Sequence, residues 1–112
     1  SSLYQKVDLV ISRSGAMTIS ELVHFKKPSI LVPFKFSAEN HQYYNAKYLQ
    51  DNLCSHLIEE ESFDSKIFLE KVKNICSNDR ILNSMIQNFQ KISTPSTLDI
   101  ISDFIVEEKY VI

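Results

Sequence analysis

Three short apolar segments alternate with helical periodicity in the first half of the chain, and this alternation constrains the fold more than any other feature. The segments are Val7 to Ile11, Ser29 to Val32 and His56 to Ile58. The stretches between them carry apolar residues at helical spacing, the first ending at Pro28 and the second running from about Glu39 to Asp51. Short apolar strands that alternate with helices are typical of parallel βαβ units. The sequence therefore predicts an α/β fold built on three parallel strands.

The rest of the chain is predicted to be helical. Its apolar positions are Phe68, Val72, Ile75 and Cys76, then Leu82, Met85, Ile86 and Phe89 after a cap at Asn78, and finally Leu98, Ile101, Phe104 and Ile105 after Thr94 and Pro95. From this pattern we predict that residues 1–112 form a single partial domain. Residues 1–61 are expected to form a strand–helix core, and residues 62–112 the C-terminal helices. Three short parallel strands with helices make up the second half of a Rossmann-like, doubly wound sheet. Such a sheet has two open edges, so we expect a larger domain or a partner to complete it.

Local signals predict where the first two helices begin and end. Thr18 and Glu21 have the spacing of a capping box, which predicts that the first helix begins there. Ser37 can cap the second helix, and Asn52 is expected in the left-handed conformation at its end. One face of the second helix is expected to carry Tyr44, Tyr48 and Leu49.

Composition excludes several classes of protein. The formal net charge is −2, which argues against a broad electrostatic surface for nucleic acid or an anionic membrane. No apolar run approaches the roughly 20 residues that a membrane helix needs, and no signal peptide is visible. Two cysteines, Cys54 and Cys76, make no disulfide framework and are expected to be reduced, small core residues of a cytosolic protein.

Two loops are expected at the carboxyl ends of the strands, where open α/β sheets bind ligands. The first, Ser12 to Thr18, contains the single glycine of the chain, Gly15. A glycine turn before a helix lets the backbone approach a ligand, and the helix N-terminus favours an anion such as a diphosphate. The same turn can also be only a tight connection. Arg13 can pair with a phosphate or bind carbonyls to hold the loop, and Glu21 can cap the helix or hold a ribose diol.

The second loop, Pro33 to Gln42, leads to further polar candidates. His41 and Asn45 lie one helical turn apart, with Gln42 beside them, and amide side chains suit sugar hydroxyls. The alternative is an ordinary polar helix surface. His24 and His56 are expected to be surface or packed residues, so no metal site is predicted. Glu59, Glu60 and Glu61 are interpreted as a solvated run.

Four blocks of the sequence occur in a characteristic order: Asp8 to Leu22 (DLVISRSGAMTISEL), Lys27 to Phe34 (KPSILVPF), Asn40 to Ala46 (NHQYYNA) and Leu57 to Glu59 (LIE). In this order they resemble the blocks of the MurG family of bacterial N-acetylglucosaminyltransferases, within glycosyltransferase family 28. The first block resembles the donor-binding signature of that family. The resemblance covers essentially the whole chain but well under half of the family's length. It implies the C-terminal, donor-binding domain of a GT-B fold.

The resemblance also implies an activity and a set of site residues. The family transfers GlcNAc from UDP-GlcNAc to undecaprenyl-diphosphoryl-MurNAc-pentapeptide, with inversion, which converts lipid I to lipid II. By position, Glu21 holds the ribose, and the turn Ser14, Gly15, Ala16, Met17 and Thr18 faces the diphosphate. The GlcNAc hydroxyls face the Ala16 backbone and the side chains of His41, Gln42 and Asn45. The family usually has a residue such as Gln at the position of His41. Arg13 is expected to organise the turn.

Further expectations follow from the same resemblance. No cofactor and no metal are expected, and UDP-GlcNAc is the donor substrate. The acceptor domain and the general base are expected upstream, so this chain alone is expected to be inactive. The full-length enzyme is expected to be peripheral on the cytoplasmic face of the plasma membrane. Two alternatives remain open: a natural split subunit that needs a partner chain with an acceptor domain, and a non-catalytic UDP-sugar binding module.

Overall fold

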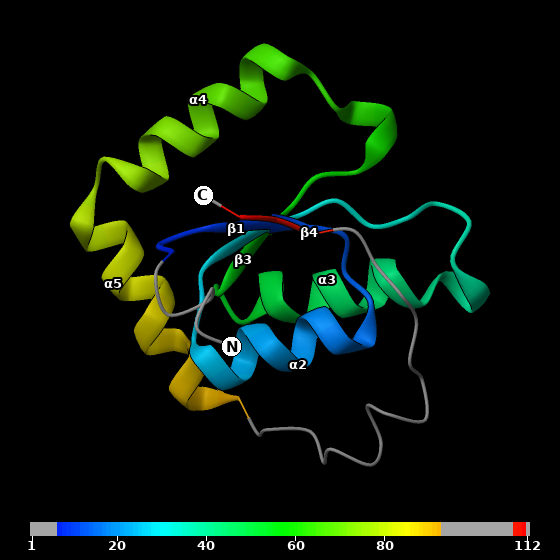
Figure 1. Ribbon diagram of the computed structural model, residues 1–112, viewed down its shortest axis with the longest axis horizontal. Coiled ribbons are helices and arrows are strands. Elements are labelled where there is room, and N and C mark those ends of the chain that lie inside the picture. The colour runs from blue at the N-terminus through cyan, green and yellow to red at the C-terminus, as the bar shows by residue number, and fades with distance from the viewer. Residues whose placement is uncertain (1–6, 93–108, 112) are drawn as a thin grey trace.

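The computed structural model describes residues 7–92 and 109–111 of the chain (Figure 1). Its strands are β1 (Val10–Ser12), β2 (Ser29–Leu31), β3 (Ser55–Leu57) and β4 (Lys109–Val111). Its α-helices are α2 (Ala16–Phe25), α3 (His41–Asp51), α4 (Ser65–Cys76) and α5 (Asp79–Asn88). Three short 3₁₀ turns join them: η1 (Ala38–Asn40), η2 (Glu60–Ser62) and η3 (Phe89–Lys91).

The strands form one sheet in the order β3-β2-β1-β4. β1, β2 and β3 are parallel, which confirms the predicted three parallel strands. β4 pairs antiparallel with β1, with Val10 opposite Val111. β4 is thus a fourth strand beyond the three that were predicted, and the sheet remains open, with β3 and β4 at its two edges.

Helices cover both faces of the sheet: α2 and α3 lie on one face and α4 on the other, while α5 runs from the α4 side past the end of the sheet toward α2 (Figure 1). Alternate residues of the strands supply the two cores, as the two-residue period of a strand requires. Val10 and Leu31 pack in the cluster with α2 and α3, whereas Leu9 and Ile30 pack in the cluster with α4 and α5. The sheet is thus buried on both faces, as is usual for parallel strands.

The start of α2 differs from the prediction. The helix begins at Ala16 with Gly15 as its N-cap, so Thr18 is inside the first turn and is fully buried. The predicted capping box is therefore wrong, because a capping threonine would have to precede the helix. The helix ends at Phe25, and the following Lys26 takes the left-handed conformation, with φ 54°.

α3 also differs in detail. Ser37 Oγ does accept a hydrogen bond from Gln42 N, at 3.2 Å, but the α-helix begins only at His41. Its buried positions are Gln42, Ala46 and Leu49, whereas Tyr44 and Tyr48 are exposed. The predicted aromatic face is therefore wrong: the small Ala46 allows the helix to lie close to the sheet, and the tyrosines face outward.

The end of α3 is a second correction. Asn52 has φ −90°, and Leu53 instead takes the left-handed conformation, with φ 61°. Asn52 instead binds the last turn of α3 with its side chain: its Nδ2 donates to Tyr48 O at 2.8 Å.

Side-chain caps start the last two described α-helices. Asp64 Oδ1 accepts from Lys66 N and Ile67 N, and Asn78 Oδ1 accepts from Arg80 N and Ile81 N, which confirms the cap predicted at Asn78.

Other predictions for this part of the chain have different outcomes. Cys54 is buried as predicted, but Cys76 is exposed, so Cys76 is not a core residue. Both thiols are free. The helix predicted after Thr94 lies outside the described residues, and the division at residue 61 stays a prediction. No helix within residues 7–92 is long and apolar enough to cross a bilayer.

Candidate functional site

The candidate site lies where β1 and β2 end and α2 and α3 begin. Gly15 is extended, with φ −72° and ψ 170°, so its left-handed freedom is not used. Gly15 is the N-cap of α2 and, because it has no side chain, it supplies no side-chain cap to the first turn. No acidic residue lies in that first turn. The turn therefore presents the positive end of a ten-residue helix, which favours an anion.

A hydrogen-bond network joins this turn to α3. Ser14 Oγ donates to Gln42 O at 2.6 Å, and Asn45 Nδ2 donates to Ser14 O at 3.0 Å. Gln42 Oε1 accepts from Phe34 N at 2.8 Å and, more weakly, from Ser14 N at 3.4 Å. Ser14 is fully buried and Gln42 is 4% exposed. The structure thus brings together three of the predicted residues from two different loops.

The amide groups of Gln42 and Asn45 are only half used by this network. Within the described residues, the structure shows no hydrogen bond to Gln42 Nε2 or to Asn45 Oδ1. One amide therefore still has a donor to offer, and the other an acceptor. That pair of groups can bind a hydroxyl from both sides.

Arg13 holds the loops together at the ends of the two strands. Its Nη1 donates to Val32 O at 3.3 Å and Pro33 O at 3.4 Å and forms an ion pair with Glu60. The guanidinium carbon also lies 5.7 Å from the centre of the Phe34 ring. Of the two roles considered for Arg13, these contacts match the one in which it binds carbonyls.

The other predicted residues differ in how accessible they are. Ala16, Met17 and Glu21 are partly exposed, and Thr18 and Glu21 already have interactions within the fold. His41 is exposed, with its Nε2 3.3 Å from Glu39 Oε2. His41 therefore lies at the rim of the arrangement, whereas Gln42 lies inside it.

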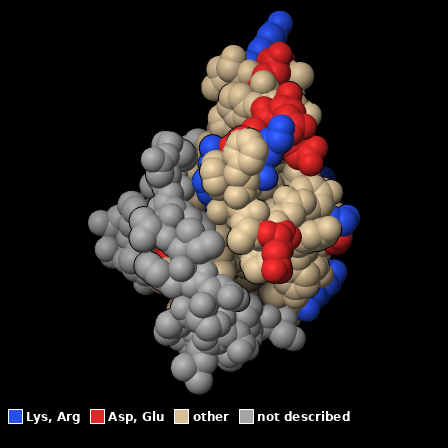
Figure 2. Space-filling view, turned by 90° about the vertical axis from the view of Figure 1, so that its right-hand side faces the viewer, with Lys and Arg blue, Asp and Glu red and all other residues tan. Residues whose placement is uncertain are grey.

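Two hollows flank the Arg13–Glu60 pair. An apolar one of about 580 Å³ is lined by Ile11, Ser12, Arg13, Val32, Glu60, Phe63 and Phe68. A more polar one of about 270 Å³ is lined by Pro33, Lys35, Asn40, Tyr43, Glu59, Glu60 and Glu61. Figure 2 shows the end of the molecule where the parallel strands terminate, with acidic and basic side chains side by side. Among the described residues of this face, Arg13 and Lys35 are paired with glutamates, so these residues do not form a basic surface.

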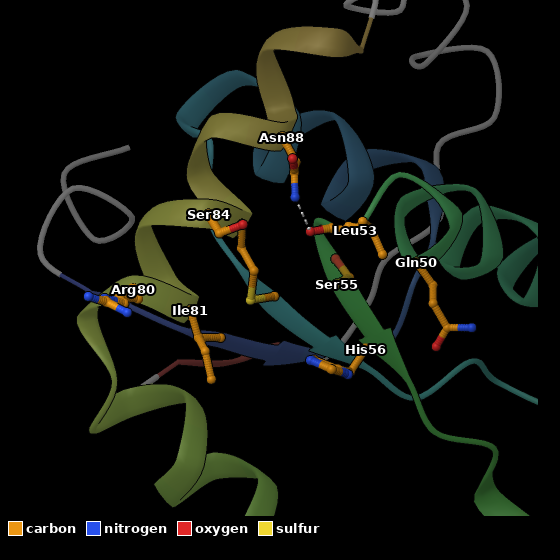
Figure 3. Close-up of a pocket in the computed structure, with 9 residues that line it drawn as sticks. Gln50, Leu53, Ser55, His56, Arg80, Ile81, Ser84 and Asn88 are labelled. Carbon is orange, nitrogen blue, oxygen red and sulfur yellow. Dashed lines mark hydrogen bonds between the residues drawn. The ribbon is translucent and has the colours of Figure 1, made fainter.

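A third hollow, of about 500 Å³, lies at the outer edge of β3, between β3 and α5 (Figure 3). Figure 3 shows Asn88 bound to the Leu53 carbonyl across it and Arg80 pointing away from β3. None of the predicted site residues lines it, so it is separate from the turn at Gly15. Burial, and then Lys71, lower the pKa of the His56 imidazole in this hollow.

The cysteines and acidic residues offer little further chemistry. Burial raises the pKa of the Cys54 thiol to about 11, so this thiol stays protonated near neutral pH. Within residues 7–92 and 109–111, no three His, Cys, Asp or Glu side chains are grouped as metal ligands would be. The chemistry that this arrangement can perform is therefore recognition by amides and helix-terminal N–H groups.

Comparison with known families decides the relationship. Residues 1–100 match the family model described as the glycosyltransferase family 28 C-terminal domain. The chain belongs to this family. The predicted family is thereby confirmed, from a match that includes the turn at Gly15, α3 and the caps of α4 and α5.

Curated relatives of this glycosyltransferase family 28 chain carry a more specific name. It is 41% identical over 88 residues to a protein of Rickettsia bellii and over 85 residues to one of Rickettsia prowazekii. Both are named UDP-N-acetylglucosamine--N-acetylmuramyl-(pentapeptide) pyrophosphoryl-undecaprenol N-acetylglucosamine transferase. The matches cover 79% and 76% of this chain but only 25% and 22% of those proteins. The chain thus spans about a quarter of the length of the relatives it matches.

A solved structure supports the fold. The crystal structure of Acinetobacter baumannii MurG matches with a TM-score of 0.75 and 24% identity, over 91% of this chain and 29% of that one. This similarity confirms the predicted half of a GT-B domain.

Some contacts around this family 28 site are not predicted by the sequence. The interpretation of Glu60 as part of a solvated run is wrong, because Glu60 pairs with Arg13. Glu61 pairs with Lys35 at 2.6 Å on the exposed surface and is not part of the site. Ser37 and the Phe34 backbone were not expected to hold Gln42, yet both do. No local pattern marks these contacts, because they join residues that are distant in sequence or use the backbone.

Proposed function

We propose that this chain is the UDP-GlcNAc-binding part of an inverting N-acetylglucosaminyltransferase that converts lipid I to lipid II in peptidoglycan synthesis. The observation that carries the proposal is the attachment of the Ser14–Gly15 turn to Gln42 and Asn45 at the start of α2. The attachment places the N-terminal end of a helix, which favours an anion, next to amide groups that can bind hydroxyls. A nucleotide sugar has both a diphosphate and sugar hydroxyls, so it requires both kinds of partner. The names of the Rickettsia relatives supply the donor and acceptor proposed here.

Each part of the donor has a proposed partner. The backbone N–H groups of the Gly15 turn and the Thr18 hydroxyl face the diphosphate, and Glu21 binds the ribose hydroxyls. Gln42 and Asn45 bind the GlcNAc hydroxyls through Nε2 and Oδ1, the atoms that the described network leaves unused. His41 reaches the sugar from the rim.

The turn also has a proposed part in the chemical step. The bond between the sugar and the diphosphate breaks, and the diphosphate gains negative charge as it leaves. N–H donors that are already oriented stabilise this charge without reorganisation, and loss of one such donor typically costs on the order of 10²–10³ in turnover. No metal or cofactor is required for this role. The general base and the lipid-linked acceptor site are proposed to lie in other parts of the full-length enzyme, at the cytoplasmic face of the membrane.

A titration of the ¹⁵N-labelled chain with UDP-GlcNAc tests the proposal. We expect shifts of the amide signals of residues 15–18, weaker shifts with UDP-GalNAc, and no transferase activity of the chain alone. Glu21→Gln is expected to weaken binding, whereas Glu70→Gln, at an exposed position on α4, is expected to leave it unchanged. The proposal fails if UDP-GlcNAc produces no shifts, or shifts only at the β3 edge.

A second experiment separates this function from a non-catalytic UDP-sugar binding module. The chain is mixed with a MurG-type relative from which the C-terminal domain has been removed, and GlcNAc transfer to lipid I is measured. Transfer in the mixture but in neither component supports the proposed function. Binding of the donor without transfer in any mixture supports a non-catalytic binding module.

A further inference from the structure

We propose that Glu60 is a positioning residue that holds the Arg13 guanidinium against the end of β2 and away from the donor. Glu60 lies 47 residues after Arg13, in η2, and their side chains are about one-third exposed. The ion pair therefore joins a turn after β3 to the segment that leads into Gly15. Its consequence for the donor rests on the proposed function, but its effect on the turn does not.

The strand alternation places Arg13 on the opposite face of the sheet from α2. Ile11 packs against the cluster formed with α4 and α5, and Arg13 follows two residues later in the same direction. Arg13 and Ile11 line the same apolar hollow, together with Phe63 and Phe68. Glu60 also lines that hollow, so the pair forms on the α4 side, whereas the N-terminus of α2 lies on the other.

The two carbonyl contacts of Arg13 are long and depend on a third partner. Nη1 is 3.3 Å from Val32 O and 3.4 Å from Pro33 O, near the limit for a hydrogen bond. A carboxylate is a much stronger acceptor for a guanidinium than a carbonyl is. Glu60 is therefore the group that fixes the position of Nη1, and the carbonyls are held as a result.

The Arg13–Glu60 ion pair also affects Gln42, the residue proposed to bind the sugar. The Arg13 guanidinium lies over the Phe34 ring, and Phe34 N donates to Gln42 Oε1. Movement of Arg13 would free the Phe34 loop and so loosen Gln42.

The neighbouring glutamate supplies a matched control. Glu61 lies in the same turn and forms its own ion pair, with Lys35 at 2.6 Å, but Lys35 is exposed and holds no strand end. Glu60→Gln and Glu61→Gln change charge and size identically. In hydrogen exchange of the 112-residue chain, we expect the Ser14 and Phe34 amides to exchange about ten-fold faster in Glu60→Gln, a factor that corresponds to ~1.4 kcal/mol. We expect less than a two-fold change in Glu61→Gln, and no change at Met85 of α5 in either variant.

Donor affinity gives a second readout. We expect Glu60→Gln to weaken UDP-GlcNAc binding three- to ten-fold and to melt within a few degrees of Glu61→Gln. The double variant Arg13→Gln/Glu60→Gln should bind no more weakly than Arg13→Gln alone, because the two residues act as one unit. Equal exchange and affinity in the Glu60 and Glu61 variants would overturn the inference, as would additive losses in the double variant. If the unmodified chain binds no UDP-GlcNAc, the proposed function fails, and the exchange experiment still decides the role of Glu60.

Discussion

Replacement of Gln42 separates the structural role of its carbonyl oxygen from the proposed ligand role of its nitrogen. Gln42 is 4% exposed, and its Oε1 accepts from Phe34 N at 2.8 Å and Ser14 N at 3.4 Å. Gln42→Leu keeps similar volume but removes the acceptor. Gln42→Glu keeps an acceptor for both N–H groups and removes the donor.

The structure gives the size of the expected effect. In Gln42→Leu, the short bond to Phe34 N is lost, and a buried donor without a partner costs about 1–3 kcal/mol. The 3.4 Å contact adds little, because hydrogen bonds weaken at that length. For a domain of this size, each kcal/mol lowers Tm by roughly 4–8 °C. In Gln42→Glu, the carboxylate accepts the same N–H groups in the first turn of α3, where negative charge is favourable. These interactions offset part of the cost of burying the charge, so the loss is expected to be smaller than in Gln42→Leu.

Thermal melts and UDP-GlcNAc titrations of both variants measure the two roles. Gln42→Leu should be destabilised and bind poorly. Gln42→Glu should be stable and still bind at least ten-fold more weakly, because it lacks the donor and places a negative charge beside a diphosphate. Gln50→Leu is the matched control: Gln50 Oε1 also accepts a backbone N–H at 2.8 Å, from Leu57, but at the sheet edge. A Gln42→Leu chain as stable as the parent, or a Gln42→Glu chain with parental affinity, would refute this reasoning.

Three further outcomes are expected from groups outside the site. Asp64→Ala should lower the free energy of unfolding by about 1 kcal/mol in a denaturant titration, because it removes the cap of α4. Iodoacetamide at pH 8 should label Cys76 in the folded chain and Cys54 only after unfolding, as mass spectrometry would detect, because Cys54 is buried with a pKa near 11. The lowered pKa of His56 means that the unfolded chain binds this proton more readily than the folded one, so stability should fall as the pH drops below about 6.5, and His56→Gln should reduce that slope.

The three parallel strands could be predicted because each leaves a complete local signal. An apolar run of β-branched residues, bounded by turn residues and followed by a helical period, specifies a buried strand without reference to the rest of the chain. The Asn78 cap could be predicted for the same reason, since its acceptor lies two and three residues from its donors. β4 offers no such signal, and its pairing with β1 joins the two ends of the chain.

The start of α2 shows where local patterns fail. The Thr18–Glu21 spacing fits a capping box, but Ser14 is buried and bound to Gln42 O, so the chain turns into the helix before Thr18. α3 shows the same limit: periodicity allows an aromatic face or one centred on Ala46, and close packing against the sheet selects the smaller residue. In both helices a tertiary contact decided between alternatives that local energies leave nearly equal.

The distribution of charge shows why the candidate site depends on amides. A chain with a net charge of −2 can still bind a diphosphate if its N–H groups converge where no carboxylate competes, and the first turn of α2 has no acidic residue. Arg13, which follows β1 just before the turn, is occupied by Glu60 and by carbonyls on the opposite face of the sheet. Arg13 therefore orders the loops, whereas the N–H groups at the start of α2 are the proposed donors to the diphosphate. Oriented N–H groups retain their partial charge over the physiological pH range, and they need no counter-charge when the site is empty. This arrangement gives the proposed diphosphate site a fixed positive end that does not depend on a charged side chain.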